Sequence, residues 1–266
     1  MVLAAAPYKL FELDRYFVPK ELVLHLTALV AVLACVRGAR RLTLTRVDTL
    51  LALFLLLGAV SSIVAENHWL AARAIGITFS GLVIYRAARA VAGMGWRRPL
   101  LATLAAAIVL ASLTSLLQAY GITSDYFSLN RAPGGTFGNR NFVAHLAAIG
   151  APVLLVILVR ARRAGGLLVA CAGVAVLAAT LVLSRSRAAM LAIIAGALVL
   201  AWGIWAAHRR WNDPRIARRL ALATAFAVAG VAAAIWVPNT LNWKSDSPYL
   251  DTVTGVVNYR EGSGHG

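Results

Sequence analysis

The stretch GGLLVACAGVAVLAATLVL, residues 165–183, contains no charged residue, and its most polar side chain is that of Thr180. An α-helix of about 20 apolar residues has the length that crosses the hydrocarbon core of a bilayer. The rest of the chain is similar, because 61% of its 266 residues are hydrophobic and 14% are charged. Soluble domains have about 45–50% apolar and about 25% charged residues. The composition therefore excludes a soluble globular domain.

Seven further apolar segments accompany this one. Together the eight are residues 22–36, 50–65, 71–88, 100–119, 142–159, 165–183, 188–206 and 220–237. We therefore predict an all-α, polytopic integral membrane protein with about eight transmembrane helices. The first segment is short for a span unless residues 17–21 are included, and the third holds Arg73 near its start, so its outer boundary is open.

Basic residues lie mainly in alternate connections between these segments. Sixteen of the 26 Lys and Arg residues lie on one side, and only two of the ten acidic residues, Asp48 and Asp213, lie with them. Cytoplasmic loops carry an excess of Lys and Arg, so this side is predicted to be cytoplasmic. The topology accounts for much of the net charge of +16, and no nucleic-acid partner is expected.

The two ends of the chain fit this topology only if the chain is a fragment. An even number of spans places both ends outside, yet residues 1–20 contain no signal peptide. The last residues, 258–266, stop within a polar stretch. We therefore expect that one span is missing upstream and that the chain ends inside an external loop.

The first candidate site closes a long external loop with the sequence RAPGGTFGNRN, residues 131–141. Its glycines permit positive φ angles, and either Asn139 or Asn141 can cap the following helix, whose N-terminus favours an anion. The pattern favours an anion cradle at the membrane surface, and a plain glycine-rich turn with an Asn cap is the alternative. The candidate binding residues are Arg131, Gly138, Asn139, Arg140 and Asn141.

The second candidate site is the external turn LSRSRAAML, residues 183–191. Arg185 and Arg187 lie on the side that the positive-inside rule disfavours, so they require another explanation. On a helix, residues two apart face about 200° apart, so both cannot face one site. Binding of an anionic substrate, chiefly by Arg187, and snorkelling to lipid phosphates remain the two interpretations.

Other chemistries find little support in the sequence. The basic loops hold no nucleotide-binding glycine motif, no Walker lysine and no paired carboxylates, and we expect no metal and no cofactor. The spans contain almost no ionisable residue apart from His25, which we expect to hydrogen-bond a neighbouring helix. His145 lies one helical turn after Asn141, where a structural role is the simpler interpretation.

Two motifs together resemble a known family. GTFGNRN (residues 135–141) before a span and SRAAML (residues 186–191) two spans later are similar to motifs of the O-antigen ligase superfamily. This superfamily comprises lipopolysaccharide O-antigen ligases, O-antigen polymerases and bacterial protein O-oligosaccharyltransferases. The resemblance implies N-terminal transmembrane helices in residues 1–117, a ligase-like core in residues 118–238 and the start of a large periplasmic loop in residues 239–266. Arg140 departs from the family pattern, which has proline there.

The resemblance implies an enzyme of the bacterial inner membrane with its site on the periplasmic face. Such a lipid-linked oligosaccharide glycosyltransferase moves a glycan from undecaprenyl pyrophosphate to an acceptor hydroxyl, with lipid A-core as the favoured acceptor. Arg187 would be the first ligand of the pyrophosphate, supported by Arg140 and the backbone of residues 138–141. The general base would be a histidine beyond Gly266, so this chain alone is expected to be inactive.

Three alternatives remain open. An O-antigen polymerase or a protein O-oligosaccharyltransferase would share the family and differ in acceptor. A transporter or flippase of lipid-linked glycan would also use external arginines, but needs charged groups along a passage through the spans. A non-catalytic membrane scaffold would not need a glycine-asparagine loop opposite two arginines.

Overall fold

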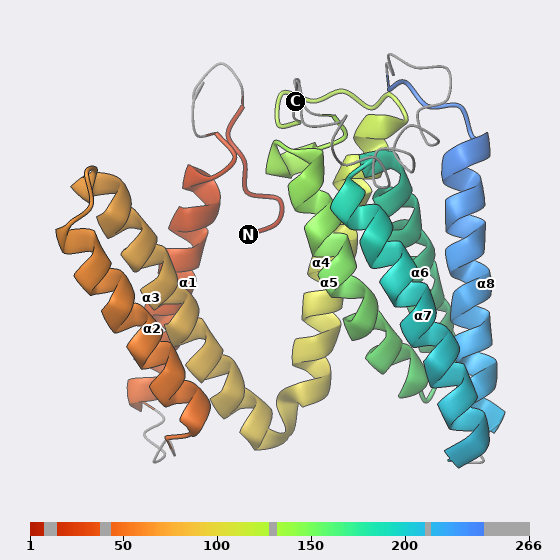
Figure 1. Cartoon of the computed structure of the whole chain (residues 1–266), viewed down its shortest axis with the longest axis horizontal. Helices are drawn as coiled ribbons and strands as arrows, with labels where there is room; N and C mark the ends of the chain where they lie inside the picture. Colours follow the sequence, from red (N-terminus) through yellow and green to blue (C-terminus); the bar gives the residue numbers. More distant parts are fainter. Residues whose placement is uncertain (8–14, 38–43, 128–131, 211–213, 242–266) are drawn as a thin grey trace. The chain divides into compact units, whose positions relative to one another are not determined.

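A computed structural model describes residues 1–7, 15–37, 44–127, 132–210 and 214–241 (Figure 1). All regular secondary structure in these ranges is helical, so the predicted all-α class is confirmed. The elements are α1 (Val18–Arg37), α2 (Arg46–Ile63), α3 (His68–Val91), the π-helical turn η1 (Ala92–Trp96), α4 (Arg97–Ala119), the 3₁₀ turn η2 (Gly135–Phe137), α5 (Arg140–Val159), α6 (Ala164–Ser184), α7 (Arg187–Arg210) and α8 (Pro214–Trp236).

The eight α-helices coincide in position with the eight apolar segments. Within the described residues, six helical runs are long and apolar enough to cross a membrane, and one of them is the continuous run His68–Ala119, which contains α3, η1 and α4. The other five are α2, α5, α6, α7 and α8. Several membrane-spanning helices are thus supported, while the number eight stays a prediction.

The chain forms two compact units. The first contains Phe17–Leu100 together with Met1, and the second contains Val2–Tyr16 and Leu101–Gly266. The boundary that the sequence placed after residue 117 lies at the end of α4, whereas this division falls near the start of that helix. The segment before α1 therefore belongs with the helices of the candidate site.

In the first unit, polar pairs join α3 to α1. His25 Nδ1 lies 2.8 Å from Ser80 Oγ, which confirms the expected hydrogen bond from His25 to a neighbouring helix. Nearer the starts of both helices, Arg73 donates to Glu21 through Nε at 2.7 Å and Nη2 at 2.8 Å. Polar side chains in an apolar helix need such partners, because unpaired polar groups are costly there.

An ion triad joins α2 to α3 in the same unit. Asp48 is 8% exposed and contacts Arg86 Nη1 and Arg89 Nη1, each at 2.7 Å. Thr45 contributes its backbone N–H, which donates to Asp48 at 2.8 Å and begins α2 with a capping box. Part of the basic charge that indicated the cytoplasmic side is therefore neutralised by one aspartate.

In the second unit, small residues let α4, α5, α6 and α8 approach closely. Gly150 on α5 packs against Ile108 on α4, and Gly230 on α8 packs against the carbonyl of Ala175 on α6. Close backbone approach through glycine is a common basis of helix association in membranes. This packing holds the helix ends that carry the two motifs.

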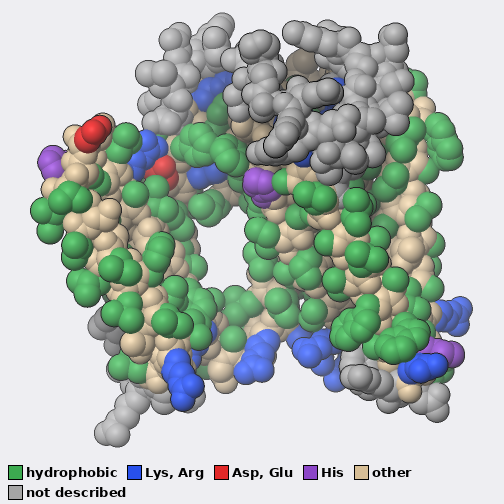
Figure 2. Space-filling model, in the orientation of Figure 1, with side chains coloured by type: hydrophobic (Ala, Val, Ile, Leu, Met, Phe, Trp, Pro, Cys, Tyr) green, Lys and Arg blue, Asp and Glu red, His purple; other side chains and the backbone are tan. Residues whose placement is uncertain are grey.

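The bundle of the second unit has two different ends. The starts of α5 and α7 and the ends of α4, α6 and α8 lie at one end, which we call the loop end (Figure 1). The other end is rich in arginine, whereas hydrophobic side chains cover the flanks of the helices (Figure 2). There Arg219 donates to the carbonyls of Val159 at 2.6 Å and Ala161 at 2.8 Å, and so caps the end of α5.

Candidate functional site

The glycine loop is held against α4. Ser115 Oγ donates to the carbonyl of Pro133, and Gln118 Oε1 accepts from the N–H of Gly135 at 2.8 Å. Pro133, Gly134, Gly135 and Thr136 are all buried. Residues 133–136 thus form an internal junction between α4 and α5, whereas residues 137–140 are half-buried.

Two glycines of the loop adopt positive φ, at 49° for Gly135 and 73° for Gly138. A Cβ atom at Gly135 would collide with Thr114 and Ser115, and one at Gly138 would collide with the ring of Tyr16. The close approaches expected of these glycines are therefore made by the protein itself. For the glycines, the structure supports the turn interpretation, because no ligand is needed to explain them.

Asn139, rather than Asn141, is the residue that caps α5. Its Oδ1 accepts from the N–H of Asn141 at 2.9 Å, and its carbonyl accepts from the N–H of Phe142 at 3.1 Å. These first-turn amides are therefore already hydrogen-bonded. The start of α5 offers an anion the helix dipole and the side chains of Arg140, half-buried, and Asn141, exposed.

The second motif forms a connection of two residues between α6 and α7. Arg185 has a φ of 48° and ends α6 in the left-handed conformation, with its N–H donating to Val182 at 3.1 Å. Arg187 is the first residue of α7. The chain reverses between the two arginines, so they lie at the ends of two different helices and the geometry of a single helix does not relate them. Arg187 is exposed and Arg185 half-buried.

Packing brings together the helices that carry the two motifs. Ala144 and Ala147 of α5 belong to the same buried cluster as Ala189 of α7 and Leu181 of α6. Ala144 lies one turn after Arg140, and Ala189 lies two residues after Arg187. The second and third turns of α5 and the first turn of α7 are thus parts of one packed core. Their two positive dipole ends and two arginines share the loop end of the bundle.

Other expected site residues are placed as follows. Arg131 and any residue beyond Gly266 lie outside the described residues. His145 is exposed on α5, one turn below Asn141. In the described ranges, no group of three His, Cys, Asp or Glu side chains is arranged to hold a metal ion.

The sequence did not indicate two residues that contact the glycine loop or the loop before it. Arg15 is 5% exposed and donates to the carbonyls of Asp125 at 3.0 Å and Phe127 at 2.9 Å. Tyr16 places its ring against Gly138. No local pattern marks this pair, because its partners lie more than a hundred residues further along the chain.

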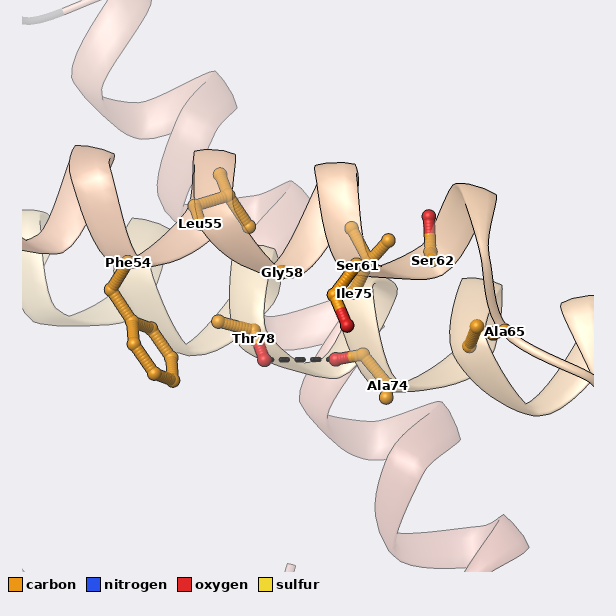
Figure 3. A pocket seen from close by; sticks show the side chains of 10 residues that line it. Phe54, Leu55, Gly58, Ser61, Ser62, Ala65, Ala74, Ile75 and Thr78 are labelled. Carbon is orange, nitrogen blue, oxygen red and sulfur yellow. Dashed lines mark hydrogen bonds between the residues drawn. The ribbon is translucent and has the colours of Figure 1, made fainter.

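Two cavities in the described structure lie elsewhere. One, of about 290 Å³, lies between α2 and α3, where Ser61, Ser62 and Thr78 contribute hydroxyls (Figure 3). The hydroxyl of Thr78 donates to its own helix at Ala74, at 2.8 Å. The other, of about 360 Å³, is an almost wholly apolar groove among α5–α8. Neither cavity is lined by a predicted site residue.

The sequence matches no protein-family model, and neither a curated protein nor a solved structure is significantly similar to it. The two motifs and their placement in this structure are therefore the features that indicate a function.

Proposed function

We propose that this protein is a membrane glycosyltransferase of the O-antigen ligase type. It would transfer a glycan from undecaprenyl pyrophosphate to an acceptor hydroxyl, with lipid A-core as the first candidate, at the periplasmic face of the bacterial inner membrane. The observation that carries this proposal is the packing of α5 against α7, which places Arg140 and Arg187 in the first turns of two adjacent helices.

The arrangement of the two arginines and the two helix N-termini is suited to stabilising a leaving pyrophosphate. When the glycosidic bond breaks, the pyrophosphate leaves with about two negative charges, which must be stabilised as they develop. Guanidinium groups bind phosphate oxygens in pairs and keep their charge near a bilayer. Two helix N-termini add positive potential at the same end of the bundle. The fixed glycine loop would hold these groups in place before the donor arrives.

The position of the arginines favours this function over simple lipid anchoring. An arginine that only meets phospholipid headgroups needs no defined neighbour. Here Arg187 begins its helix directly after a two-residue turn, and Arg140 follows a residue that caps its helix. Both side chains therefore start from fixed backbone positions, as a specific phosphate site requires.

Donor binding is the direct test, because it does not depend on the general base. The purified protein in lipid nanodiscs should bind undecaprenyl pyrophosphate more tightly than undecaprenol, and Arg187→Ala should weaken binding of the pyrophosphate lipid only. Equal affinity for the two lipids would refute the proposal. A transfer assay with the lipid-linked glycan and lipid A-core would then identify the acceptor.

A further inference from the structure

The segment before α1 packs on the glycine loop. Thr136, which is 4% exposed, donates from Oγ1 to the carbonyl of Val2 at 2.6 Å. The ring of Tyr16 lies against Gly138, two residues further along the loop. Both contacts lie within the second compact unit. Val2 and Tyr16 are therefore part of the structure that leads into α5.

Arg15 ties this segment to a second part of the external region. Its guanidinium donates to the carbonyls of Asp125 and Phe127 and to the hydroxyl of Tyr16. Its Cζ atom also lies 4.5 Å from the centroid of the Tyr16 ring, in a cation–π contact. A buried charge is costly unless it is fully hydrogen-bonded, so this geometry is strongly determined. Arg15 thus fixes the Tyr16 ring relative to the loop that leaves α4.

Tyr16 in turn limits where Gly138 can lie. Gly138 has a φ of 73°, and the next residue is the cap Asn139. The ring occupies the space that a side chain at residue 138 would fill. A movement of the ring would let Gly138 leave its left-handed conformation, since glycine also populates other regions readily. The direction in which α5 begins would change with it.

We infer that Arg15 and Tyr16 are positioning residues, which fix Gly138 and thereby the first turn of α5 with Arg140 and Asn141. Their effect on ligand binding rests on the proposed function, because the pyrophosphate site is the site whose geometry they would set. A site held in its binding geometry loses less conformational freedom when the ligand binds.

Cysteine labelling tests the positioning without any ligand. In a Cys35→Ser background, Asn141→Cys is labelled with a water-soluble maleimide in detergent. Tyr16→Ala should change the labelling rate by about fivefold or more. A factor of five corresponds to the loss of ~1 kcal/mol by which the ring stabilises one position of the first turn of α5. Tyr16→Phe keeps the ring on Gly138 and should stay near the parent rate. The matched control is Tyr126→Ala, because Tyr126 is a tyrosine of the same external region and 45% exposed.

A double-mutant cycle tests the contact itself. Gly138→Ala should disturb labelling strongly, because its Cβ meets the Tyr16 ring. In the Tyr16→Ala background the same change should have a smaller effect, because the clash with the ring is gone and only the cost of a left-handed alanine remains. Equal rates for Tyr16→Ala and the parent, or additive effects in the cycle, would overturn the inference. If Tyr16→Ala is not recovered as a monodisperse protein, Tyr16→Leu replaces it under the same criteria.

Affinity for undecaprenyl pyrophosphate separates positioning from mere stability. At a temperature where all variants are folded, Tyr16→Ala should weaken binding by about fivefold or more, and Tyr16→Phe should restore most of it. A lower Tm with unchanged affinity and labelling would mean a structural role only. If the parent itself does not bind this lipid, the proposed function fails, and the labelling experiment still decides whether Tyr16 positions α5.

Discussion

Arg73 on α3 and Glu21 on α1 form a two-point ion pair, with Nε–Oε2 at 2.7 Å and Nη2–Oε1 at 2.8 Å. Both side chains are about one-fifth exposed, at 19% and 21%. In the sequence, Arg73 made the start of the third span uncertain. The structure explains how a helix that begins at His68 accepts an arginine in its second turn, because the charge is neutralised by the neighbouring helix.

This pair should stabilise the first unit. Arg73→Ala should lower the free energy of unfolding by about 2 kcal/mol, because it leaves Glu21 without its charged partner. Arg73→Lys should recover only part of this loss, since an ammonium group cannot form the two parallel bonds. Thermal unfolding of the purified protein in detergent is the measurement. The exposed Arg98→Ala is the control, and an equal loss from both alanine variants would contradict the prediction.

Gly230 should be needed where α8 crosses α6. A Cβ atom there would overlap the carbonyl of Ala175, so Gly230→Ala should destabilise the protein by about 1–3 kcal/mol. Gly196 on α7 is the matched control, because nothing lies within 4 Å of its Cβ position. Gly196→Ala should be neutral or stabilise by up to ~1 kcal/mol through helix propensity. Gly230→Ala should therefore lower the Tm, whereas Gly196→Ala should leave it unchanged or raise it. Equal lowering of the Tm by both substitutions would contradict the prediction.

Arginines at the basic end should differ in their effect on stability. Arg219 caps α5 through two carbonyls, whereas its neighbour Arg218 is exposed. Arg219→Ala should therefore cost about 1–2 kcal/mol of stability and Arg218→Ala almost nothing. The comparison of denaturation curves for the two variants is the test. Matching curves would show that the cap contributes nothing measurable.

The helices could be predicted from the sequence because they depend on local apolar length. Much of the site could not, because it depends on backbone conformation and tertiary packing. Apolar length determines where a helix can cross a bilayer, so residues 165–183 already indicated α6. A left-handed Arg185 has no such signal, because the stretch around it contains neither glycine nor proline. The contact between Tyr16 and Gly138 depends on tertiary packing, which no local pattern records. The motif did predict a cap at Asn139 or Asn141, because Asn side chains accept from helix amides.

The topology itself can be tested. The connection after α5 carries Arg160, Arg162 and Arg163 and should lie in the cytoplasm. A reporter inserted after Arg163 should therefore act as cytoplasmic, and one inserted after Asn242 should act as periplasmic. Green fluorescence and alkaline phosphatase activity give opposite readouts for the two sides. The reversed pattern would move the loop end, with its two motifs, to the cytoplasmic side and would exclude the proposed reaction.

Substitution of Arg187 should reduce glycan transfer more than substitution of Arg185. The sequence suggested this from the geometry of a single helix, whereas in the structure the two arginines belong to different helix ends. The two side chains differ because Arg185 ends α6 in the left-handed conformation, while Arg187 begins α7, a helix that packs against α5. Arg187 is exposed in this structure, so a phosphate contact there is sheltered from water only by the bound donor. Loss of such a contact should cost about 2–4 kcal/mol of transition-state stabilisation, or roughly 30- to 1,000-fold in rate. Arg187→Ala should show this loss in glycan transfer, and Arg187→Lys should recover little of it.

Arg185→Gly is the matched control for this last experiment. Glycine adopts a φ of 48° without steric cost, so the substitution removes the charge and keeps the turn. It should retain most of the transfer activity and relieve about 1 kcal/mol of backbone strain, which would appear as a higher Tm. Transfer is measured in a ligase-null strain with membrane levels checked by immunoblot. If Arg187→Ala transfers glycan as well as the parent at equal levels, Arg187 does not bind the leaving pyrophosphate. If Arg185→Gly is as damaging as Arg187→Ala, the pair acts together and the assignment to Arg187 alone is wrong.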